Sequence, residues 1–360
     1  MKLKKLVLKQ DQNNVKSVQQ LKDTVCKQLV ETLALNFNFQ DYMEDFESFK
    51  QNPIYKYIHS RNDLYQNIVQ DIKKCSNLAS VNLLFNHCSL QMLSENWFKN
   101  FLEAFNHCQK LTKFAINVLS NGISIRQARI LGNLLSTSDN LLDVNINLQF
   151  HSLQDQHLKG LTSGLMKLKK IQILILDISH NLIRDQGALL LGNSISKCLS
   201  LKNLTVYLEC NYLSENGIES FLEGVFKCKQ LDYLDLDIGS SIEISQSTLK
   251  SFHSGLINLR YLQYLSFVYD SNKLRNSSVD NLCQNLTELK CLLHIKIDLY
   301  NNQIFYEGLK QMLDKLYEIK DLRTINLLLK NNSIEFEKSI TKQKNKLLRL
   351  KRLILFHLEY

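Results

Sequence analysis

The sequence predicts an α/β solenoid, a single elongated stack of strand–helix units about 30 residues long. First, an apolar frame recurs with starts at 78, 111, 141, 171, 201, 231, 262, 292 and 322, which are 30 to 33 residues apart. Second, each frame alternates apolar and polar residues with the period of two that a strand requires. Third, each frame is followed by apolar residues at helical spacing, which share one helix face. A unit this short cannot bury its own apolar side, so neighbouring units must stack their strands into one parallel sheet.

The copy that starts at Ile171 shows the frame most fully. Leu174, Leu176 and Ile178 continue the inward places, and Asn181 follows the strand. An asparagine amide both donates and accepts at the point where the backbone loses its ladder partners, so we expect it to link one repeat to the next. Three repeats replace this asparagine with another side chain that can donate, namely Cys88, His151 and Ser241.

This L-x-x-L-x-L frame followed by N/C-x-L resembles the leucine-rich repeat, and the long helical second half is similar to the ribonuclease-inhibitor subtype. The resemblance covers residues 78–335, with weaker frames at Val30 and Leu350. It implies a curved horseshoe of about 9–11 repeats, with the parallel sheet on the concave face and helices on the convex face. Five residues separate Leu176 from Asn181, two more than is usual for the family. We therefore expect longer strands or an ordered bulge after each strand.

The organisation expected is one continuous solenoid in three stretches. Residues 1–77 form an N-terminal cap with irregular first repeats, 78–335 the regular repeats, and 336–360 a C-terminal helix and last strand. The frame at Leu350 turns Ile354 and Phe356 outward on an uncapped edge strand. An open strand edge predicts contact with a partner or self-association at that end.

The net charge of +9 is concentrated at the ends, with +5 in residues 1–29, +6 in residues 338–360 and −2 between them. Nucleic-acid binders typically carry a continuous basic stripe, so RNA binding through the termini is the least favoured function. No apolar run approaches the roughly 20 residues of a membrane span, and the start lacks a signal-peptide pattern. We expect a cytoplasmic or nuclear protein without membrane association.

The nine cysteines contain no C-x-x-C pair, which favours reduced thiols over disulfides or zinc. Phosphate-binding loops, kinase signatures, G-x-S-x-G and H-E-x-x-H are absent from the sequence, so we expect no enzyme activity, cofactor, metal or small-molecule substrate. Four cysteines lie three residues before a frame start and are expected to be small apolar core residues: Cys75, Cys108, Cys198 and Cys228.

The outward places of the strands form an acidic, tyrosine-rich patch. Tyrosine supplies contact area and carboxylates attract cations, so the sequence predicts a scaffold that binds a protein or peptide, favoured to be basic, on this concave face. Two alternatives stay open: regulation of an enzyme, as ribonuclease inhibitors and GTPase-activating repeat proteins do, and a solvated face without a partner. The predicted site residues are Asp177, Tyr207, Glu209, Tyr233, Asp235, Asp237, Tyr264, Asp270, Asp298 and Tyr300.

Overall fold

The structure is a computed structural model, and contacts within the chain divide it into two compact units. Unit 1 comprises Met1–Ile171 and unit 2 comprises Gln172–Tyr360. The residues described are 5–10, 32–38, 69–86 without 71, 95–118, 122–239, 248, 252, 254–269, 274–284, 286–334 and 337–360.

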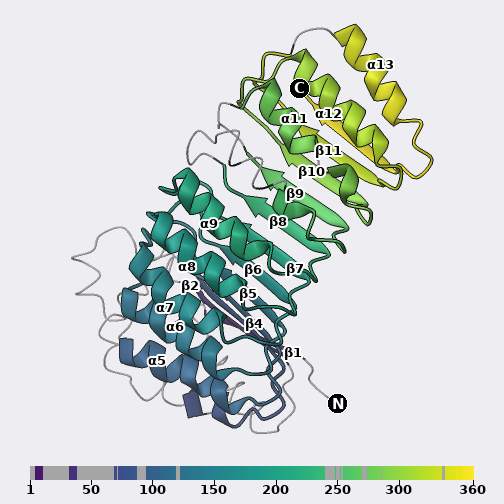
Figure 1. The fold of residues 1–360 in the computed structure, drawn as a ribbon. Coiled ribbons are helices and arrows are strands. Elements are labelled where there is room, and N and C mark those ends of the chain that lie inside the picture. The colour runs from purple at the N-terminus through teal and green to yellow at the C-terminus, as the bar shows by residue number, and fades with distance from the viewer. Residues whose placement is uncertain are drawn as a thin grey trace. The chain divides into compact units, whose positions relative to one another are not determined.

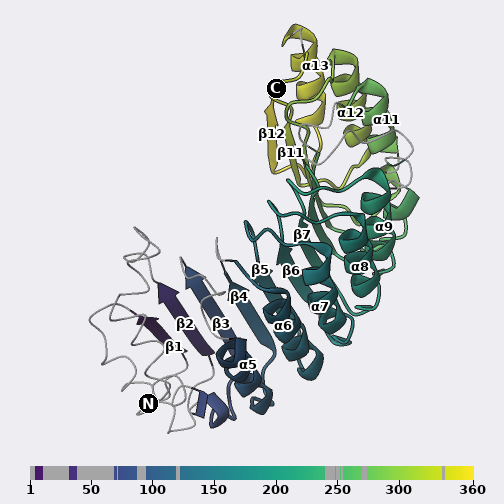
Figure 2. The same cartoon turned by 90° about the vertical axis from the view of Figure 1, so that its left-hand side faces the viewer.

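In unit 1 the strands lie side by side in chain order and are all parallel (Figure 2). Leu33 pairs with Val81, which pairs with Phe114, so the predicted weak frame at Val30 is in register with the regular repeats. The strands are β1 (Lys5–Gln10), β2 (Thr32–Asn38), β3 (Ser80–Asn86), β4 (Lys113–Asn117) and β5 (Asp143–Asn147). The helices are α5 (Glu95–Glu103), η3 (Ala104–His107), α6 (Ile125–Thr137) and α7 (Asp155–Leu165).

Unit 2 repeats the same arrangement, with parallel strands in chain order and helices packed on one side of the sheet (Figure 1). Its strands are β6 (Ile173–Asp177), β7 (Asn203–Tyr207), β8 (Tyr233–Asp237), β9 (Tyr264–Val268), β10 (His294–Asp298), β11 (Thr324–Leu328) and β12 (Leu355–Glu359). Its helices are α8 (Asp185–Ile195), α9 (Glu215–Val225), α11 (Asn276–Gln284), η4 (Leu286–Glu288), α12 (Tyr306–Glu318) and α13 (Glu337–Leu347).

The core of each unit lies between the sheet and its helices, which confirms the α/β solenoid. The inward places of the frame are fully buried, as at Leu174, Leu176 and Ile178. The four cysteines predicted to be core residues are all buried. Burial raises the pKa of the Cys108 and Cys228 thiols to about 12, so both stay protonated and unreactive.

The strands are short, and the two extra residues of the frame form an ordered turn. Strand β6 ends at Asp177, but Ile178 N–H still donates to Tyr207 O at 3.1 Å and His180 N–H donates to Glu209 O at 2.9 Å. Contact between repeats thus continues beyond the strand. His180 has a φ of 53°, a left-handed conformation that lets the chain reverse before the asparagine place.

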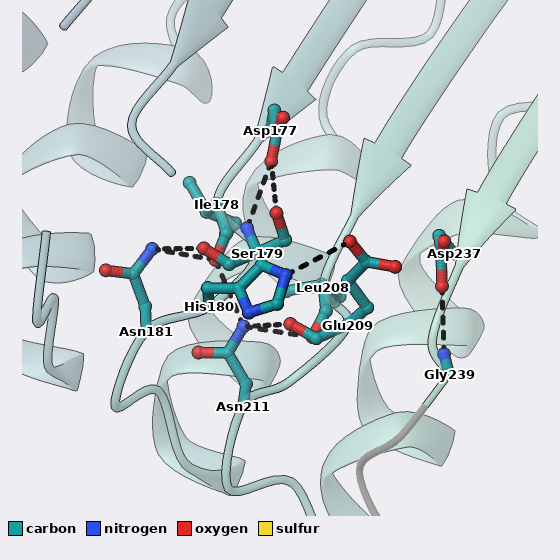
Figure 3. A network of polar contacts seen from close by, with 10 residues as sticks. All are labelled: Asp177, Ile178, Ser179, His180, Asn181, Leu208, Glu209, Asn211, Asp237 and Gly239. Atoms are coloured by element: carbon teal, nitrogen blue, oxygen red, sulfur yellow. Dashed lines mark hydrogen bonds and ion pairs between the residues drawn. The ribbon is translucent and has the colours of Figure 1, made fainter. Parts of the chain in front are cut away.

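The asparagine place forms the predicted link between repeats (Figure 3). Asn211 Nδ2 donates to Ile178 O of the preceding repeat at 3.0 Å and to Leu208 O at 2.9 Å, while its Oδ1 accepts from Ile183 N–H at 3.0 Å. Asn302 and Asn332 repeat this pattern. One side chain therefore satisfies three backbone groups that would otherwise be buried without partners.

His151 occupies the same place in unit 1. Its Nε2 bonds to Val118 O, the carbonyl equivalent to the one that Asn211 reaches. The other two predicted substitutes, Cys88 and Ser241, lie outside the described residues.

A second link joins successive helix starts. Asp185, in the first turn of α8, accepts from Ser214 N–H at 2.7 Å and from the Ser214 hydroxyl. Asn276 accepts in the same way from Phe305 N–H at 2.9 Å. Gly217 allows the first approach, because a Cβ there would lie 2.3 Å from Asp185 Oδ1.

The last strand corrects the predicted C-terminal frame. Strand β12 pairs with β11 so that Phe356 lies opposite Ile325, which is fully buried. Phe356 therefore faces the core side and Leu355 the opposite side, so the prediction that Phe356 points outward was wrong.

The physical reason is a shift of three residues, which reverses the faces of a strand. The true frame begins at Leu353, 31 residues after Leu322, rather than at Leu350. Ile354 is 80% exposed, as the sequence suggested. The helix and strand expected within residues 336–360 are both present, as α13 and β12.

Candidate functional site

The sheet face opposite the helices of unit 2, called the open face below, presents three rows of side chains that cross neighbouring strands in register. The first row is Ile173, Asn203, Tyr233, Tyr264, His294 and Thr324. The second row is Ile175, Thr205, Asp235, Ser266, Lys296 and Asn326. The third row is Asp177, Tyr207, Asp237, Val268, Asp298 and Leu328.

The rows hold seven of the predicted site residues. Glu209 and Tyr300 lie instead in the turns that follow β7 and β10, and Asp270 lies outside the described residues. The structure therefore gathers the patch mainly on β6 to β9, with Asp298 two strands beyond Asp237 in the same row.

The strand-end acids have a structural role that the sequence analysis missed. Asp177 Oδ1 accepts from Ser179 N–H at 3.1 Å and from the Ser179 hydroxyl at 2.7 Å (Figure 3). Asp237 Oδ1 accepts from Gly239 N–H at 3.0 Å, and Asp298 Oδ1 accepts from the backbone of Tyr300 at the same distance. Each carboxylate holds the turn after its strand, as aspartate and asparagine often do two residues ahead. The signal was the recurrence of Asp or Asn at the last strand position.

Two further site residues have partners outside the rows. Glu209 Oε1 lies 3.5 Å from His180 Nε2 of the neighbouring turn, and both side chains are about one-third exposed (Figure 3). The hydroxyl of Tyr300 accepts from Asn331 Nδ2 at 2.8 Å. These contacts join the loops of adjacent repeats, so both residues belong to the edge of the open face.

The centre of the open face is an organised group on β7, β8 and β9. The Tyr207 hydroxyl donates to Asp235 Oδ2 at 3.1 Å. The rings of Tyr233 and Tyr264 stack with centroids 4.2 Å apart and planes within 5°. His294 continues this aromatic row, with its centroid 6.4 Å from that of Tyr264. The tyrosines are thus held as rigid surfaces, which lowers the entropic cost of using them as contacts.

The environment keeps these phenols protonated. Burial, and then the neighbouring carboxylate of Asp235, raises the pKa of Tyr207 above its usual value. Burial and the adjacent Tyr264 raise the pKa of Tyr233 likewise. Both hydroxyls therefore remain hydrogen-bond donors at any physiological pH.

The comparisons with known proteins bear on the repeat itself. No family model matches the chain. Among curated proteins, the chain is similar to Protein NLRC5 of Ictalurus punctatus, a leucine-rich-repeat protein, with 22% identity over 192 residues. That alignment covers 53% of this chain and 10% of the relative, so the chain spans about a tenth of the relative's length.

The alternating strands and helices on parallel strands form an α/β solenoid of the leucine-rich-repeat type. A solved structure of a Bacteroides fragilis protein matches 100% of this chain and 76% of its own, with 13% identity and a TM-score of 0.38. Within the described residues, no helix is both long and apolar enough to cross a membrane. Among the described residues, no group of three or more His, Cys, Asp or Glu side chains is close enough to hold a metal ion.

Proposed function

We propose that the chain is a non-enzymatic interaction module that binds a protein or peptide, favoured to be basic, on the open face of unit 2. The observation that supports this is the central group, where Asp235 is flanked by Tyr207 and by the stacked pair of Tyr233 and Tyr264. Stacked parallel repeats present such a sheet face as an extended binding surface. Aromatic residues at its centre are typical of the residues that dominate binding energy.

Asp235 is the acid best suited to attract a partner. Its carboxylate accepts from the hydroxyl of Tyr207 on the face itself, whereas Asp177 and Asp237 each hold a turn. A charge at the centre of a patch that excludes water contributes more to binding than one at the rim.

Further proposals concern the subtype of the repeats, the organisation of the chain and its location. We assign the repeats to the ribonuclease-inhibitor-like subtype because a helix follows most described strands and the repeats are about 30 residues long. We also propose that the solenoid consists of an N-terminal cap with irregular first repeats in residues 1–77, regular repeats in 78–335 and a C-terminal helix and strand in 336–360, and that the protein is cytoplasmic or nuclear and needs no cofactor.

The test is affinity capture with mass spectrometry on the 360-residue chain. We expect partners of the wild type to be lost with Asp235→Lys, which reverses the central charge. The matched control is Glu223→Lys, an exposed acid on helix α9, which should keep every partner. Equal capture by wild type and Asp235→Lys contradicts the proposal.

Regulation of an enzyme would use the same surface. An enzyme assay distinguishes it from binding without regulation. A captured enzyme whose rate changes when the pure chain is added identifies a regulator. RNA binding through the basic C-terminus is less favoured, because Lys346 and Arg352 there are already paired with Asp314 and Asp321.

A further inference from the structure

The second row of the open face carries opposite charges that do not meet. Asp235 and Lys296 lie on the same face, separated by Ser266 of the strand between them. Two strand spacings place their backbones about 10 Å apart. Within the described part of the chain Lys296 forms no ion pair, and the hydrogen bond recorded for the Asp235 side chain comes from Tyr207.

The same row contains polar atoms whose hydrogen-bonding capacity is not used. Ser266 is fully buried, yet its Oγ has no partner. Asn326, next to Lys296 in register, has a buried Oδ1 in the same condition. Buried polar groups without partners are rare and mark places where a ligand or water completes the bonding.

The surroundings of Asp235 suit a planar cation. Tyr207 contacts Asp235 from β7, and Tyr233 lies two residues before it on the same face of β8. Tyr233 stacks on Tyr264 with one ring face, and its in-register neighbour on the other side, on β7, is Asn203. A guanidinium group can lie on an aromatic ring and donate to a carboxylate at once, which the compact lysine ammonium does less well.

We propose that strands β7 to β11 of the open face bind an extended peptide that carries an arginine and, three residues later, a carboxylate. The guanidinium lies at Asp235 against Tyr207 and Tyr233, and the carboxylate meets Lys296. This deepens the proposed function and rests on it, because it names the partner chemistry of the same face.

The spacing follows from the geometry of the chain. In a polyproline II conformation residues three apart point the same way and are separated by about 9 Å, which matches the two-strand distance between Asp235 and Lys296. Asn326 Oδ1 accepts from a peptide N–H.

The experiment titrates the 360-residue chain, with ¹³C-labelled tyrosine rings, with Ac-Pro-Arg-Pro-Pro-Glu-Pro-NH2 followed by NMR. Proline holds each preceding residue in the extended region, so the probe is preorganised. We expect the ring signals of Tyr207 and Tyr233, assigned with Tyr→Phe variants, to shift. Replacing arginine by its uncharged isostere citrulline should weaken binding by about tenfold or more, the value of one charge-assisted hydrogen bond. Replacing Glu by Gln should weaken it less.

Variants of the protein separate the two charges. Asp235→Asn should abolish the discrimination between arginine and citrulline, and Lys296→Met should abolish that between Glu and Gln. The matched controls are Glu223→Gln on α9 and Lys310→Met on α12, both exposed, which should keep both discriminations. A thermal melt of each variant shows whether it is folded.

The outcomes separate this inference from the function on which it rests. Equal binding of the arginine and citrulline peptides, or no shift with any peptide, overturns the inference. If Asp235→Lys still loses captured partners in that case, the proposed function stands and another ligand chemistry occupies the face. If Asp235→Lys keeps them all, both fail.

Discussion

The sheet faces of the two units differ in chemistry although their backbones repeat the same pattern. In unit 1 the outward places of β4 and β5 hold Ala115, Asn145 and other small neutral residues, and their one pair of charges, Lys113 and Asp143, lies 3.4 Å apart and is self-neutralising. In unit 2 the equivalent places hold the stacked Tyr233 and Tyr264, the aspartates of the second and third rows, and Lys296, which is not paired with Asp235. The repeat therefore sets the positions of outward side chains and leaves their chemistry free.

The comparison also separates structure from charge at the strand ends. Asn147 Oδ1 in unit 1 accepts from Gln149 N–H at 3.1 Å, as Asp177 does from Ser179 N–H. A neutral amide thus performs the turn function of the acids. The negative charges of Asp177, Asp237 and Asp298 exceed what the turns need, and we propose that they contribute long-range attraction for a basic partner on the open face.

The largest effect should come from breaking the repeat link in unit 2. Asn211→Ala removes three hydrogen bonds to buried backbone groups and should lower the free energy of unfolding by about 2–4 kcal/mol. Urea denaturation measures this. Asn193→Ala, an exposed asparagine on α8, should change it by less than about 0.5 kcal/mol. Equal effects of the two substitutions would show that the link is not important for stability.

The repeat link that His151 forms in unit 1 should differ from the asparagine link, because its contribution to stability should depend on pH. Burial lowers the pKa of His151 from 6.5 to about 4, so the folded chain keeps the ring neutral while the unfolded chain protonates it near pH 6.5. Stability from this residue is complete above pH 6.5, is lost as the pH falls toward 4, and can reach about 3 kcal/mol. His151→Asn should remove that dependence.

The measurement is hydrogen exchange of β4 and β5 amides at several pH values, corrected for intrinsic rates. The amides of β7, linked through Asn211, provide the internal control, since an asparagine amide does not titrate. Unchanged acid sensitivity in His151→Asn would place its cause elsewhere in unit 1.

A smaller effect should follow from adding a side chain at Gly217, where helix α9 lies against the start of helix α8. A Cβ at Gly217 meets Asp185 Oδ1 at 2.3 Å and the Asp185 Cα at 2.9 Å, so Gly217→Ala should cost about 1–3 kcal/mol through displacement of the helix. Asn216→Ala, one residue earlier and exposed, is the control in the same thermal melts. A Gly217→Ala melting temperature equal to that of the control would mean that the helix start adjusts freely.

The smallest effect on stability should come from the strand-end acids. The triple substitution Asp177→Asn, Asp237→Asn and Asp298→Asn keeps every turn acceptor and should change the free energy of unfolding by less than about 0.5 kcal/mol. Affinity for a basic partner should nevertheless fall, and more steeply at low salt, because the long-range attraction is removed. If the triple variant keeps both full affinity and full stability, then of these four acids only Asp235 contributes its charge to binding.

The fold was predictable because the alternation of inward and outward strand residues recurs about every 30 residues. The inward places at Leu174 and Leu176, the cysteine positions and the asparagine link all follow from a fixed period, and all are confirmed. The C-terminal frame failed where leucines at 350 and 353 offered two starts three residues apart. Only the spacing from Leu322 distinguishes these starts, since hydrophobicity does not.

The candidate site was predictable as a set of outward residues and not as an arrangement. Alternation places Tyr233 and Asp235 on one face, but no local rule shows that Tyr207 reaches across to Asp235 or that Ser266 is covered. Those facts depend on side-chain conformations between strands 30 residues apart. The turn role of Asp177 was readable from its spacing to Ser179.

The asparagine link has the same geometry at each of the three repeats where its hydrogen bonds are seen in full. Asn211, Asn302 and Asn332 each donate to the residue 33 positions earlier, and each accepts from the residue 28 positions earlier. Excising or duplicating one 30-residue segment would return every such amide to an equivalent carbonyl and N–H. The asparagine link therefore sets no limit of its own on the number of repeats in such a chain.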